Sequence, residues 1–389
     1  MSSKLGPASG VATLLLLTGC LCAPSRPVPA AQAPAFNFDR FVYLEEVAEN
    51  TANASLGDLD GDGDPDIVLA KGRHWPQRDL VLLNDGQGDF GERHALGTLA
   101  ERTYTAALAD LDGDKDLDLV VGNDRPDAKR VYLNDGKGQF TVGGTFGNPE
   151  WSTRNVTVAD LDGDARPDII VANRGGPDRL CENVICDNDG QGRFPSCRPL
   201  SRDSATTIAA ADMDGDGSID LIVPHQDPGQ SYLFLNDGHG QFAAKQAIGP
   251  ADAATRAVAT GDLNGDGRLD LVMGDELRGG AHVYFNEGEG QFSAPVSLDV
   301  DQHSVYSIAV ADLNRDGRLD VVLGNDSTPS LVLINEGDGR RYTATPLAAV
   351  DGAVYGLAVG DLTGDGCADI VAARSNARSI LYINACAGR

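Results

Sequence analysis

The stretch DLDGDGDPD, Asp58 to Asp66, contains five Asp and two Gly in nine residues. The same pattern recurs six more times, as DLDGDKDLD, DLDGDARPD, DMDGDGSID, DLNGDGRLD, DLNRDGRLD and DLTGDGCAD. The first Asp residues of successive copies are 52, 50, 52, 50, 50 and 49 residues apart. A near-constant period of this length is typical of an array of repeated structural units. The chain is therefore predicted to consist of seven copies of one unit.

Each unit carries the same order of signals, shown by the second: TAALAD, the acidic stretch, LDLVVGND and RVYLNDGKGQF. The apolar segments are short, rich in Val, Ile, Leu and Tyr, and bounded by Gly, Asn and Asp, which indicates β-strands. Asn-Asp-Gly-x-Gly motifs, such as Asn134 to Gly138, supply residues that tolerate positive φ in tight hairpins. We therefore expect four strands and no helix in each unit.

The two ends of the chain favour a closed arrangement of these units. The last unit stops at ILYINACAGR, directly after its third strand, so its fourth strand is missing. Phe38 precedes Asp58 by 20 residues, and Phe90, Phe140, Phe242 and Phe292 precede later acidic stretches by the same spacing. We expect the segment FDRFVYL, residues 38–44, to supply the missing strand and so remove an exposed sheet edge. The predicted fold is all-β, a seven-bladed β-propeller whose last blade is closed by the N-terminal strand; a linear solenoid is the alternative.

The D-x-D-x-D-G-x-x-D stretches and the NDGxGxF hairpins resemble those of the FG-GAP/VCBS repeat proteins, whose propeller blades include those of integrin α-subunits. The resemblance covers about residues 36 to 385. It implies the propeller fold. It says little about activity, because such proteins include adhesion modules, carbohydrate binders and accessory domains of enzymes.

The acidic stretches have the oxygen donors that calcium prefers. Ca²⁺ takes about six to eight oxygen ligands, and side chains at positions 1, 3, 5 and 9 with a carbonyl at position 7 can wrap one ion. In the first stretch these donors are Asp58, Asp60, Asp62, the carbonyl of Asp64, and Asp66. An EF-hand also needs a Glu at position 12 and flanking helices, whereas this chain has Leu69 and strands. An EF-hand sensor is therefore excluded.

The other six stretches keep donors at the same positions. They are Asp110, Asp112, Asp114 and Asp118; Asp160, Asp162, Asp164 and Asp168; Asp212, Asp214, Asp216 and Asp220; Asp262, Asn264, Asp266 and Asp270; Asp312, Asn314, Asp316 and Asp320; and Asp361, Thr363, Asp365 and Asp369. The second and third lack Gly at position 6, and Thr363 predicts that the seventh binds most weakly. The alternative is solvated loops, but mutual repulsion of clustered carboxylates favours a cation. Up to seven Ca²⁺ would change the formal charge from -27 to -13.

Composition limits the partners. The chain has 58 acidic and 31 basic side chains, which argues against nucleic acid or an anionic membrane surface and favours cations. No G-x-S-x-G, H-E-x-x-H or phosphate-binding Gly loop occurs. We therefore expect a monomeric binding, adhesion or scaffold module. The alternative is a calcium-dependent polysaccharide lyase or a lectin, for which Arg154, Arg256, His225 and His303 are the candidate residues.

The N-terminal residues predict export. Residues 1–19 contain Lys4 and an apolar run from Val11 to Leu17, which is too short for a membrane span and typical of a secretory signal. The motif LTGC, ending at Cys20, resembles the bacterial lipobox, whose Cys is lipidated; an ordinary signal cleaved near Ala30 is the alternative. Residues 20–35 are rich in Pro and Ala and predict a tether, followed by the propeller at 36–389. We expect a protein of the bacterial cell envelope, lipid-anchored at the outer membrane, or a secreted one.

Two rings of residues are predicted on the face away from the acidic stretches. Six residues before each first Asp, where an inner strand begins, stand Ala52, Tyr104, Arg154, Thr206, Arg256, Tyr306 and Tyr355. Five residues after each last Asp stand Lys71, Asn123, Asn173, His225, Asp275, Asn325 and Arg374. From these we select Tyr104, Arg154, Arg256, Tyr306, Tyr355 and His225 as candidate ligand-binding residues, because aromatic faces and planar donors suit sugars or carboxylates. The alternative is that Tyr fills the channel and Arg offsets nearby Asp.

The seven cysteines fit an exported protein with disulfides. Cys367 and Cys386 fall on the same predicted face, so they can form a bridge. Of Cys181, Cys186 and Cys197 we expect two to pair, although the sequence does not determine which two.

Overall fold

A computed structural model describes residues 36–175, 182–298, 300, 304–348 and 351–386. The chain divides into two units, Met1–Ala33 and Pro34–Arg389, and every described residue belongs to the second. The expected signal segment, Cys20 and the tether lie outside the described residues. The described part contains strands and no α-helix, as expected, and accordingly no helix there is long and apolar enough to cross a membrane.

Five four-stranded sheets follow the repeats along the chain, as the sequence predicts. They are β6 (Thr103–Ala109), β7 (Asp118–Asn123), β8 (Lys129–Asn134) and β9 (Phe140–Phe146); β10 (Thr153–Ala159), β11 (Asp168–Asn173), β12 (Asn183–Cys186) and β13 (Cys197–Ser201); β14 (Ala209–Ala211), β15 (Asp220–Val223), β16 (Gly229–Leu235) and β17 (Ala244–Ala253); β18 (Thr255–Gly261), β19 (Asp270–Asp275), β20 (Ala281–Tyr284) and β23 (Val296–Ser297); and β24 (Val305–Ala311), β25 (Asp320–Asn325), β26 (Leu331–Asn335) and β27 (Tyr342–Pro346). A short hairpin of β21 (Asn286–Gly288) and β22 (Gln291–Phe292) is added in the fifth repeat.

The first and last repeats share one eight-stranded sheet. Its strands are β1 (Arg40–Tyr43), β2 (Glu49–Gly57), β3 (Asp66–Lys71), β4 (Leu80–Leu83), β5 (Glu92–Ala95), β28 (Ala353–Gly360), β29 (Asp369–Ala377) and β30 (Ile380–Ile383). The strand expected within residues 38–44 is present as β1, and it pairs antiparallel with β30 from Arg40↔Ile383 to Tyr43↔Ile380. β2 also pairs with β29, through Glu49↔Ala377.

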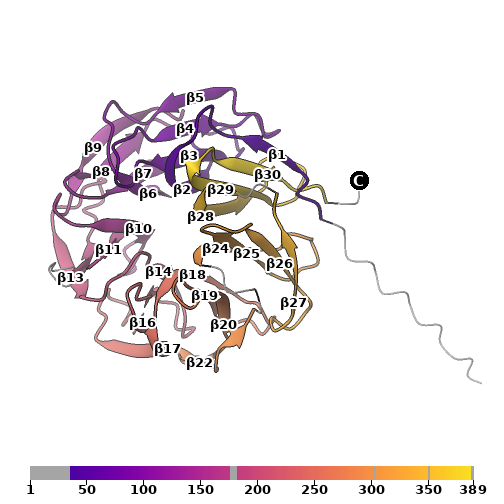
Figure 1. Ribbon diagram of the computed structural model, residues 1–389. Helices are drawn as coiled ribbons and strands as arrows, with labels where there is room; N and C mark the ends of the chain where they lie inside the picture. The colour runs from indigo at the N-terminus through magenta and orange to yellow at the C-terminus, as the bar shows by residue number, and fades with distance from the viewer. Residues whose placement is uncertain (1–35, 176–181, 299, 301–303, 349–350, 387–389) are drawn as a thin grey trace, which may run out of the picture. The chain divides into compact units, whose positions relative to one another are not determined.

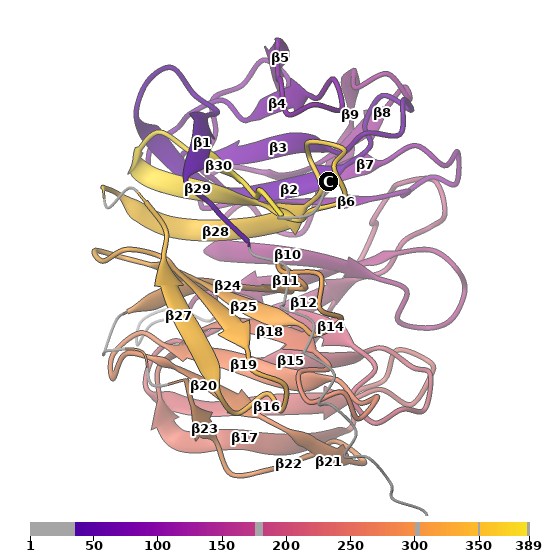
Figure 2. The same cartoon turned by 90° about the vertical axis from the view of Figure 1, so that its right-hand side faces the viewer.

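The sheets follow one another around a common centre, with the first strand of each repeat innermost (Figure 1). Figure 2 shows the same sheets from the side. Apolar side chains of neighbouring sheets pack together. Val120 and Val131 of one sheet, for example, contact Val156, Ile169 and Val171 of the next. Because each second strand lies inside its sheet and between two such cores, β7 and β11 are buried along their whole length.

A buried Asn at or just after the end of each third strand ties its repeat to the preceding one. Asn134 Nδ2 donates to the carbonyl of Leu59 in the preceding repeat (2.8 Å) and to that of Leu117 in its own (3.1 Å). Equivalent bonds between repeats run from Asn84 to Leu362, Asn188 to Leu111, Asn236 to Leu161, Asn286 to Met213, Asn335 to Leu263 and Asn384 to Leu313. The bond from Asn84 to Leu362 joins the first repeat to the last.

Replacing one of these residues, Asn236→Ala, is expected to lower the free energy of unfolding by roughly 2–4 kcal/mol. The change leaves the buried carbonyls of Leu161 and Ile219 without the donor that now lies 2.8 and 2.9 Å away. Gln241→Ala, at an exposed position of the same hairpin, is the control and should cost less than about 0.5 kcal/mol. Urea unfolding measures both, and equal midpoints would contradict the role of the Asn.

Candidate functional site

The acidic stretches form the turns between the first two strands of each repeat. In four of them, three carboxylates offer oxygens that all lie within 4.8 Å of one another. These groups are Asp58, Asp60 and Asp62; Asp110, Asp112 and Asp118; Asp160, Asp162 and Asp164; and Asp212, Asp214 and Asp220. Clustered carboxylate oxygens are donors that suit Ca²⁺. The repeated clusters are therefore candidate metal sites.

The first Asp of a turn holds its backbone in a fixed conformation. Asp58 accepts the N–H of Gly61 through Oδ1 (2.8 Å) and that of Gly63 through Oδ2 (3.0 Å). Position 6 has a positive φ of 94° at Gly63, and also of 79° at Lys115 and 65° at Ala165. The second and third turns therefore adopt the same conformation without Gly, at the cost of a side chain in a left-handed backbone conformation.

The last Asp of a turn has a structural role that the sequence did not reveal. Asp66 is fully buried and accepts the N–H of Leu59 through Oδ2 (2.7 Å) and that of Asn84 through Oδ1 (2.8 Å). Burial raises the pKa of Asp66 to about 6, and it does the same at Asp118, Asp168, Asp220, Asp320 and Asp369. Ionising a buried carboxylate beside other carboxylates is costly, and a bound cation offsets that cost. The donor set therefore fits calcium.

The turns differ in the surroundings of the Asp at position 5. In the third, fifth and sixth turns it forms an ion pair with an Arg at position 7; the pairs are Arg166–Asp164, Arg268–Asp266 and Arg318–Asp316. In the seventh, Thr363 donates to Asp369 (3.3 Å). Within the described residues, the fifth to seventh turns contain no cluster of three carboxylates. The first, second and fourth turns combine such a cluster with the absence of a competing Arg at position 7.

A cavity of about 170 Å³ lies at the opposite ends of the inner strands. All seven members of the first predicted ring line it: Ala52, Tyr104, Arg154, Thr206, Arg256, Tyr306 and Tyr355. The structure therefore brings together five of the six candidate ligand-binding residues, each from a different sheet.

β-Bulges place these residues. The pairing of β6 with β7 passes from Thr103↔Asn123 to Thr105↔Gly122, so Tyr104 is an extra residue without a partner in the ladder. The same register shift occurs at Ala52, Arg154, Arg256, Tyr306 and Tyr355. Bulges redirect side chains and are frequent beside functional sites. Six of the seven ring positions are thus bulged residues that line one cavity.

The two Arg residues of the cavity wall are held by carboxylates. Arg154 forms an ion pair with Asp124 (2.8 Å), and its guanidinium lies 4.3 Å from the centroid of the Tyr104 ring. Arg256 forms an ion pair with Glu276 (3.1 Å). The predicted alternative was that Arg offsets nearby Asp; Arg154 does pair with an Asp, whereas the partner of Arg256 is a Glu, and both ion pairs hold the Arg side chains at the wall.

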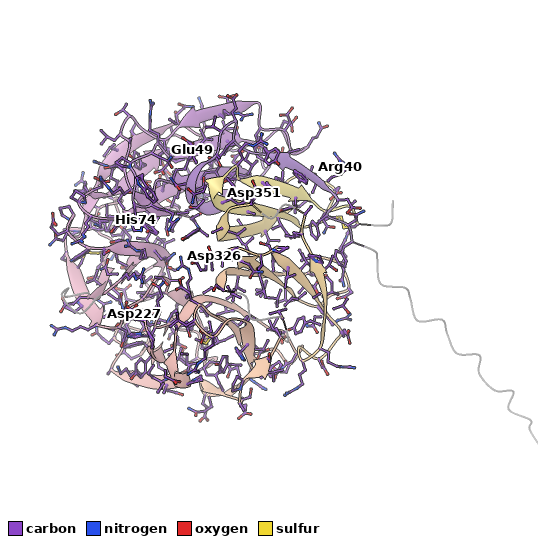
Figure 3. The ribbon with its side chains drawn as sticks, viewed as in Figure 1. Arg40, Glu49, His74, Asp227, Asp326 and Asp351 are labelled. Carbon is purple, nitrogen blue, oxygen red and sulfur yellow. A yellow bond between two sulfur atoms is a disulfide. The ribbon has the colours of Figure 1, made fainter. Side chains whose placement is uncertain are left out.

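Tyr104 also belongs to a hydrogen-bonded chain. Its hydroxyl lies 2.9 Å from His74 Nε2, and His74 Nδ1 lies 3.3 Å from Asp124 Oδ2. Burial and the positive charge of Arg154 lower the pKa of His74, so the ring is neutral near pH 7. A neutral His oriented by a carboxylate can accept a proton. Figure 3 labels His74 on the side of the molecule where β6 and β10 lie.

Arg73, which the sequence analysis missed, is not itself a lining residue but contacts two residues of the cavity wall, Tyr355 and Tyr104. Its guanidinium lies 3.5 Å from the centroid of the Tyr355 ring and 5.9 Å from that of Tyr104. It donates to the Tyr355 hydroxyl (2.6 Å) and to Ser375 Oγ (2.9 Å). Arg73 stands in the loop from β3 to β4, outside both ring positions. The signal in the sequence was the loop GRHWPQR, residues 72–78, which the other repeats lack.

His225 is the one candidate that the structure leaves away from the cavity. It is not among the lining residues, and its Nδ1 lies 2.5 Å from the carbonyl oxygen of Asp227. Other members of its predicted ring are buried in the sheets; Asn123 and Asn173, for example, accept hydrogen bonds from Thr hydroxyls. His303 lies outside the described residues. The second ring is therefore mainly part of the scaffold.

Two disulfides are present, Cys186–Cys197 and Cys367–Cys386. The second is the bridge expected from the sequence, and the first resolves which two of the three central cysteines pair. Cys181 lies outside the described residues.

Asp79 anchors the loop that carries Arg73. It is buried, its Oδ1 accepts the N–H of Lys71 (2.7 Å), and its Oδ2 lies 2.9 Å from the hydroxyl of Thr103, to which the protonated carboxyl donates. Burial raises the pKa of Asp79 to about 7. Because the folded state holds this proton more tightly than the unfolded chain does, the stability contributed by protonated Asp79 is present at pH 4 and is lost as the pH rises to about 7.

Asp79→Asn is expected to raise the free energy of unfolding by roughly 3 kcal/mol at pH 7.5 and to change it little at pH 4. The amide accepts from Lys71 and donates to Thr103, so both bonds survive and the ionisation is removed. Denaturant unfolding at the two pH values checks this, with the exposed Asp39→Asn as the control. A variant whose stability follows that of the wild type at both pH values would refute it.

Comparisons with known proteins agree with this architecture. A family model described as FG-GAP-like repeat matches residues 58–121, 110–171, 160–223, 212–273, 264–323 and 312–372. Among solved structures, the chain is similar to a lectin of Agrocybe aegerita described as recognising non-reducing terminal N-acetylglucosamine, with 22% identity over 78% of this chain and 80% of that chain and a TM-score of 0.55. It is also similar to BBS1N in complex with ARL6DN, soaked with lead (12% identity, 88% and 95% covered, TM-score 0.57) or with mercury (13%, 91% and 97%, 0.58). These identities show a shared fold alone. No curated protein matches the chain.

Proposed function

We propose that this chain, which belongs to the FG-GAP-like repeat family, is a calcium-stabilised, seven-bladed β-propeller that binds a glycan in the cavity at its centre. The convergence of Tyr104, Tyr306, Tyr355, Arg154 and Arg256 on one cavity carries the proposal. Aromatic faces stack on sugar rings, and guanidinium groups donate planar pairs of hydrogen bonds to oxygen atoms. The protein is thus a binding module, as its composition and motifs predict.

The seven-bladed, closed architecture has two independent supports. The antiparallel pairing of β1 with β30 supplies a fourth strand to the last repeat. The bond from Asn84 to Leu362 repeats, between the first and last repeats, the contact that joins every other neighbouring pair. In a ring closed in this way, β1 covers the edge of β30 that would otherwise be exposed.

Calcium is proposed to bind in the acidic turns. The clustered oxygens of the first four turns and the buried last Asp of each turn support this role. The turns follow the inner strands at their C-terminal ends, whereas the cavity residues lie at the N-terminal ends. Calcium therefore stiffens the ring from one side, and the glycan is held on the other.

The cavity is small compared with pockets for drug-sized ligands, which measure about 300–1,000 Å³. At about 170 Å³ it takes the end of a chain, such as one sugar unit, and leaves the remainder outside. Recognition of a terminal sugar is described for the Agrocybe aegerita lectin, and we propose the same mode of binding here.

A polysaccharide lyase is the second candidate, and one observation favours it. The chain Asp124–His74–Tyr104 lies beside Arg154. In a uronic acid polymer, Arg154 would neutralise the carboxylate while His74 removes the C5 proton. The C4–O bond then breaks, the leaving oxygen takes a proton from the Tyr104 hydroxyl, and a C4–C5 double bond remains. Incubation with polyuronides, followed by ultraviolet absorbance of the unsaturated product, tests this activity. Continuous formation of that product would show that the protein is an enzyme and not a binding module.

Export to the cell envelope is proposed from residues 1–35 and supported by the two disulfides, which form in oxidising compartments. Cys20 is the proposed site of lipidation. The mass of the mature N-terminal peptide tests it, because an unmodified Cys20 would exclude the lipid anchor.

A glycan array probed with the calcium-loaded protein tests the proposed function. We expect binding to a subset of glycans, and loss of that binding in the double variant Arg154→Ala/Arg256→Ala. Arg278→Ala, which removes an exposed Arg paired with Asp252, is the control. An array with no bound glycan would reject the glycan-binding function.

A further inference from the structure

We propose that the cavity selects sugars that carry a carboxylate and that Arg73 is the residue that recognises this group. The inference rests on the proposed glycan-binding function and names the class of ligand. Arg154 and Arg256 already have carboxylate partners, at 2.8 and 3.1 Å. Arg73 has none within 4.0 Å in the part of the chain that the structure describes, and its Nε is buried without a hydrogen-bond partner. Its guanidinium donates to the neutral hydroxyls of Tyr355 and Ser375, so no acidic group of the described residues neutralises its charge.

Arg73 lies beside two residues that line the cavity, Tyr355 and Tyr104. Its guanidinium stacks on Tyr355, and the rings of Tyr355 and Tyr306 meet edge to face with centroids 5.0 Å apart. Tyr104, on the other side of Arg73, also lines the cavity. A carboxylate that binds Arg73 would lie beside aromatic rings, and a charge-assisted hydrogen bond from a guanidinium is stronger than one between neutral groups.

The loop that carries Arg73 is held in place before any ligand binds. Its backbone bonds to neighbouring strands: Gly72 N–H donates to Asn50 (2.8 Å), Arg73 N–H to Thr103 (3.0 Å) and Gln77 N–H to Glu101 (3.0 Å). Arg73 itself has a φ of 56°, a left-handed conformation that is unusual for a residue with a side chain. Strained residues held by their surroundings cluster at binding sites. The loop therefore fixes the guanidinium at little cost in entropy on binding.

Trp75, two residues after Arg73, offers an aromatic surface on which a sugar ring can stack. Its side chain is 55% exposed, which is unusual for a Trp that a loop holds rigidly. It contacts His74 edge to face at 5.8 Å, and His74 contacts Tyr104 at 5.6 Å. An exposed indole that contacts the cavity residue Tyr104 through His74 can stack on the next unit of the glycan. The aromatic surroundings favour a carboxylated sugar over the carboxylate of a peptide.

Calorimetric titration of the calcium-loaded protein tests the inference with matched probes. These are the methyl glycosides of glucuronic and galacturonic acid, the methyl glucoside and galactoside that lack only the carboxylate, and N-acetylalanine as a carboxylate without a sugar. We expect at least one uronide to bind about tenfold or more tightly than its neutral counterpart.

Three variants separate the roles. Arg73→Gln is expected to remove the preference for the uronide, and Trp75→Ala to weaken uronide and neutral glycoside by the same factor. Arg341→Gln, an exposed Arg on an outer strand loop paired with Glu336 and Asp338, is the control and should change nothing. Thermal melts of all three establish that each variant is folded.

The outcomes are distinct. Equal binding of uronide and neutral glycoside would overturn the inference and leave glycan binding standing, whereas no binding of any glycan here or on the array would overturn both. If Arg73→Gln still prefers the uronide, Arg73 is not the residue that recognises the carboxylate. If N-acetylalanine binds as tightly as the uronides, the cavity recognises a peptide carboxylate without a sugar, which also contradicts the inference.

Discussion

Removing calcium with a chelator is expected to lower the Tm of the protein by roughly 10–20 °C. An ion that binds only the folded state contributes about 2.7 kcal/mol when its concentration is 100 times its Kd. The four turns with clustered carboxylates would together contribute on the order of 10 kcal/mol. The effect is large because chelation also restores the repulsion among carboxylates held close together by the fold.

Differential scanning calorimetry in calcium, and again after chelation, measures this effect. Asp212→Asn weakens the fourth turn and should lower the Tm in calcium by a few degrees, whereas Asp237→Asn, in the exposed hairpin of the same repeat, should not. Restoring calcium should restore the Tm. Identical melts with and without chelator would show that the acidic turns are solvated loops.

Deleting the N-terminal strand is the second change with a large expected effect. A chain without residues 1–43 loses β1, and β30 becomes an exposed edge. Phe38, 7% exposed, leaves a core formed with Leu313, Val332 and Tyr382. We expect a loss of about 5 kcal/mol or more, because an aromatic side chain and a strand of ladder bonds are removed together.

Thermal unfolding and size-exclusion chromatography check this deletion. The control lacks residues 1–35 only and keeps β1, so it should melt as the full chain does and stay monomeric. The chain without residues 1–43 should melt far lower or associate through its open edge. Equal melts of the two deletions would contradict closure by β1 and favour the linear solenoid.

Much of the fold could be predicted because each position of the repeat occurs seven times in the sequence. The short apolar segments predicted four strands in each repeat. The 20-residue spacing of Phe38 from Asp58 predicted the N-terminal strand that pairs with β30. The ring of cavity residues followed from the same spacing. The bulges that place them could not be predicted, because one extra residue in a strand leaves the apolar pattern of the other positions unchanged.

The parts of the site that were missed depend on contacts between distant segments. Arg73 reaches Tyr355 and Ser375 across the junction of the first and last repeats, at a separation of about 300 residues. The buried carboxylate of Asp66 is shared between a turn and a hairpin. His225 was selected because it stands five residues after the last Asp of its turn. In the structure its Nδ1 contacts the carbonyl oxygen of Asp227 in its own loop instead of reaching the cavity. Spacing gives the position of a residue in its repeat, whereas loop conformation determines what its side chain contacts.

The central claim is that calcium and ligand act at opposite ends of the same inner strands. Hydrogen-exchange mass spectrometry of the full chain, with and without calcium and then with the best-binding uronide, tests it most directly. Calcium should protect the turns that begin at Asp58, Asp110 and Asp212, and the uronide should protect residues 72–77, 103–105 and 354–357 at the cavity. Protection of the acidic turns by the uronide would mean that the sugar binds the calcium ions directly, and it would contradict the account.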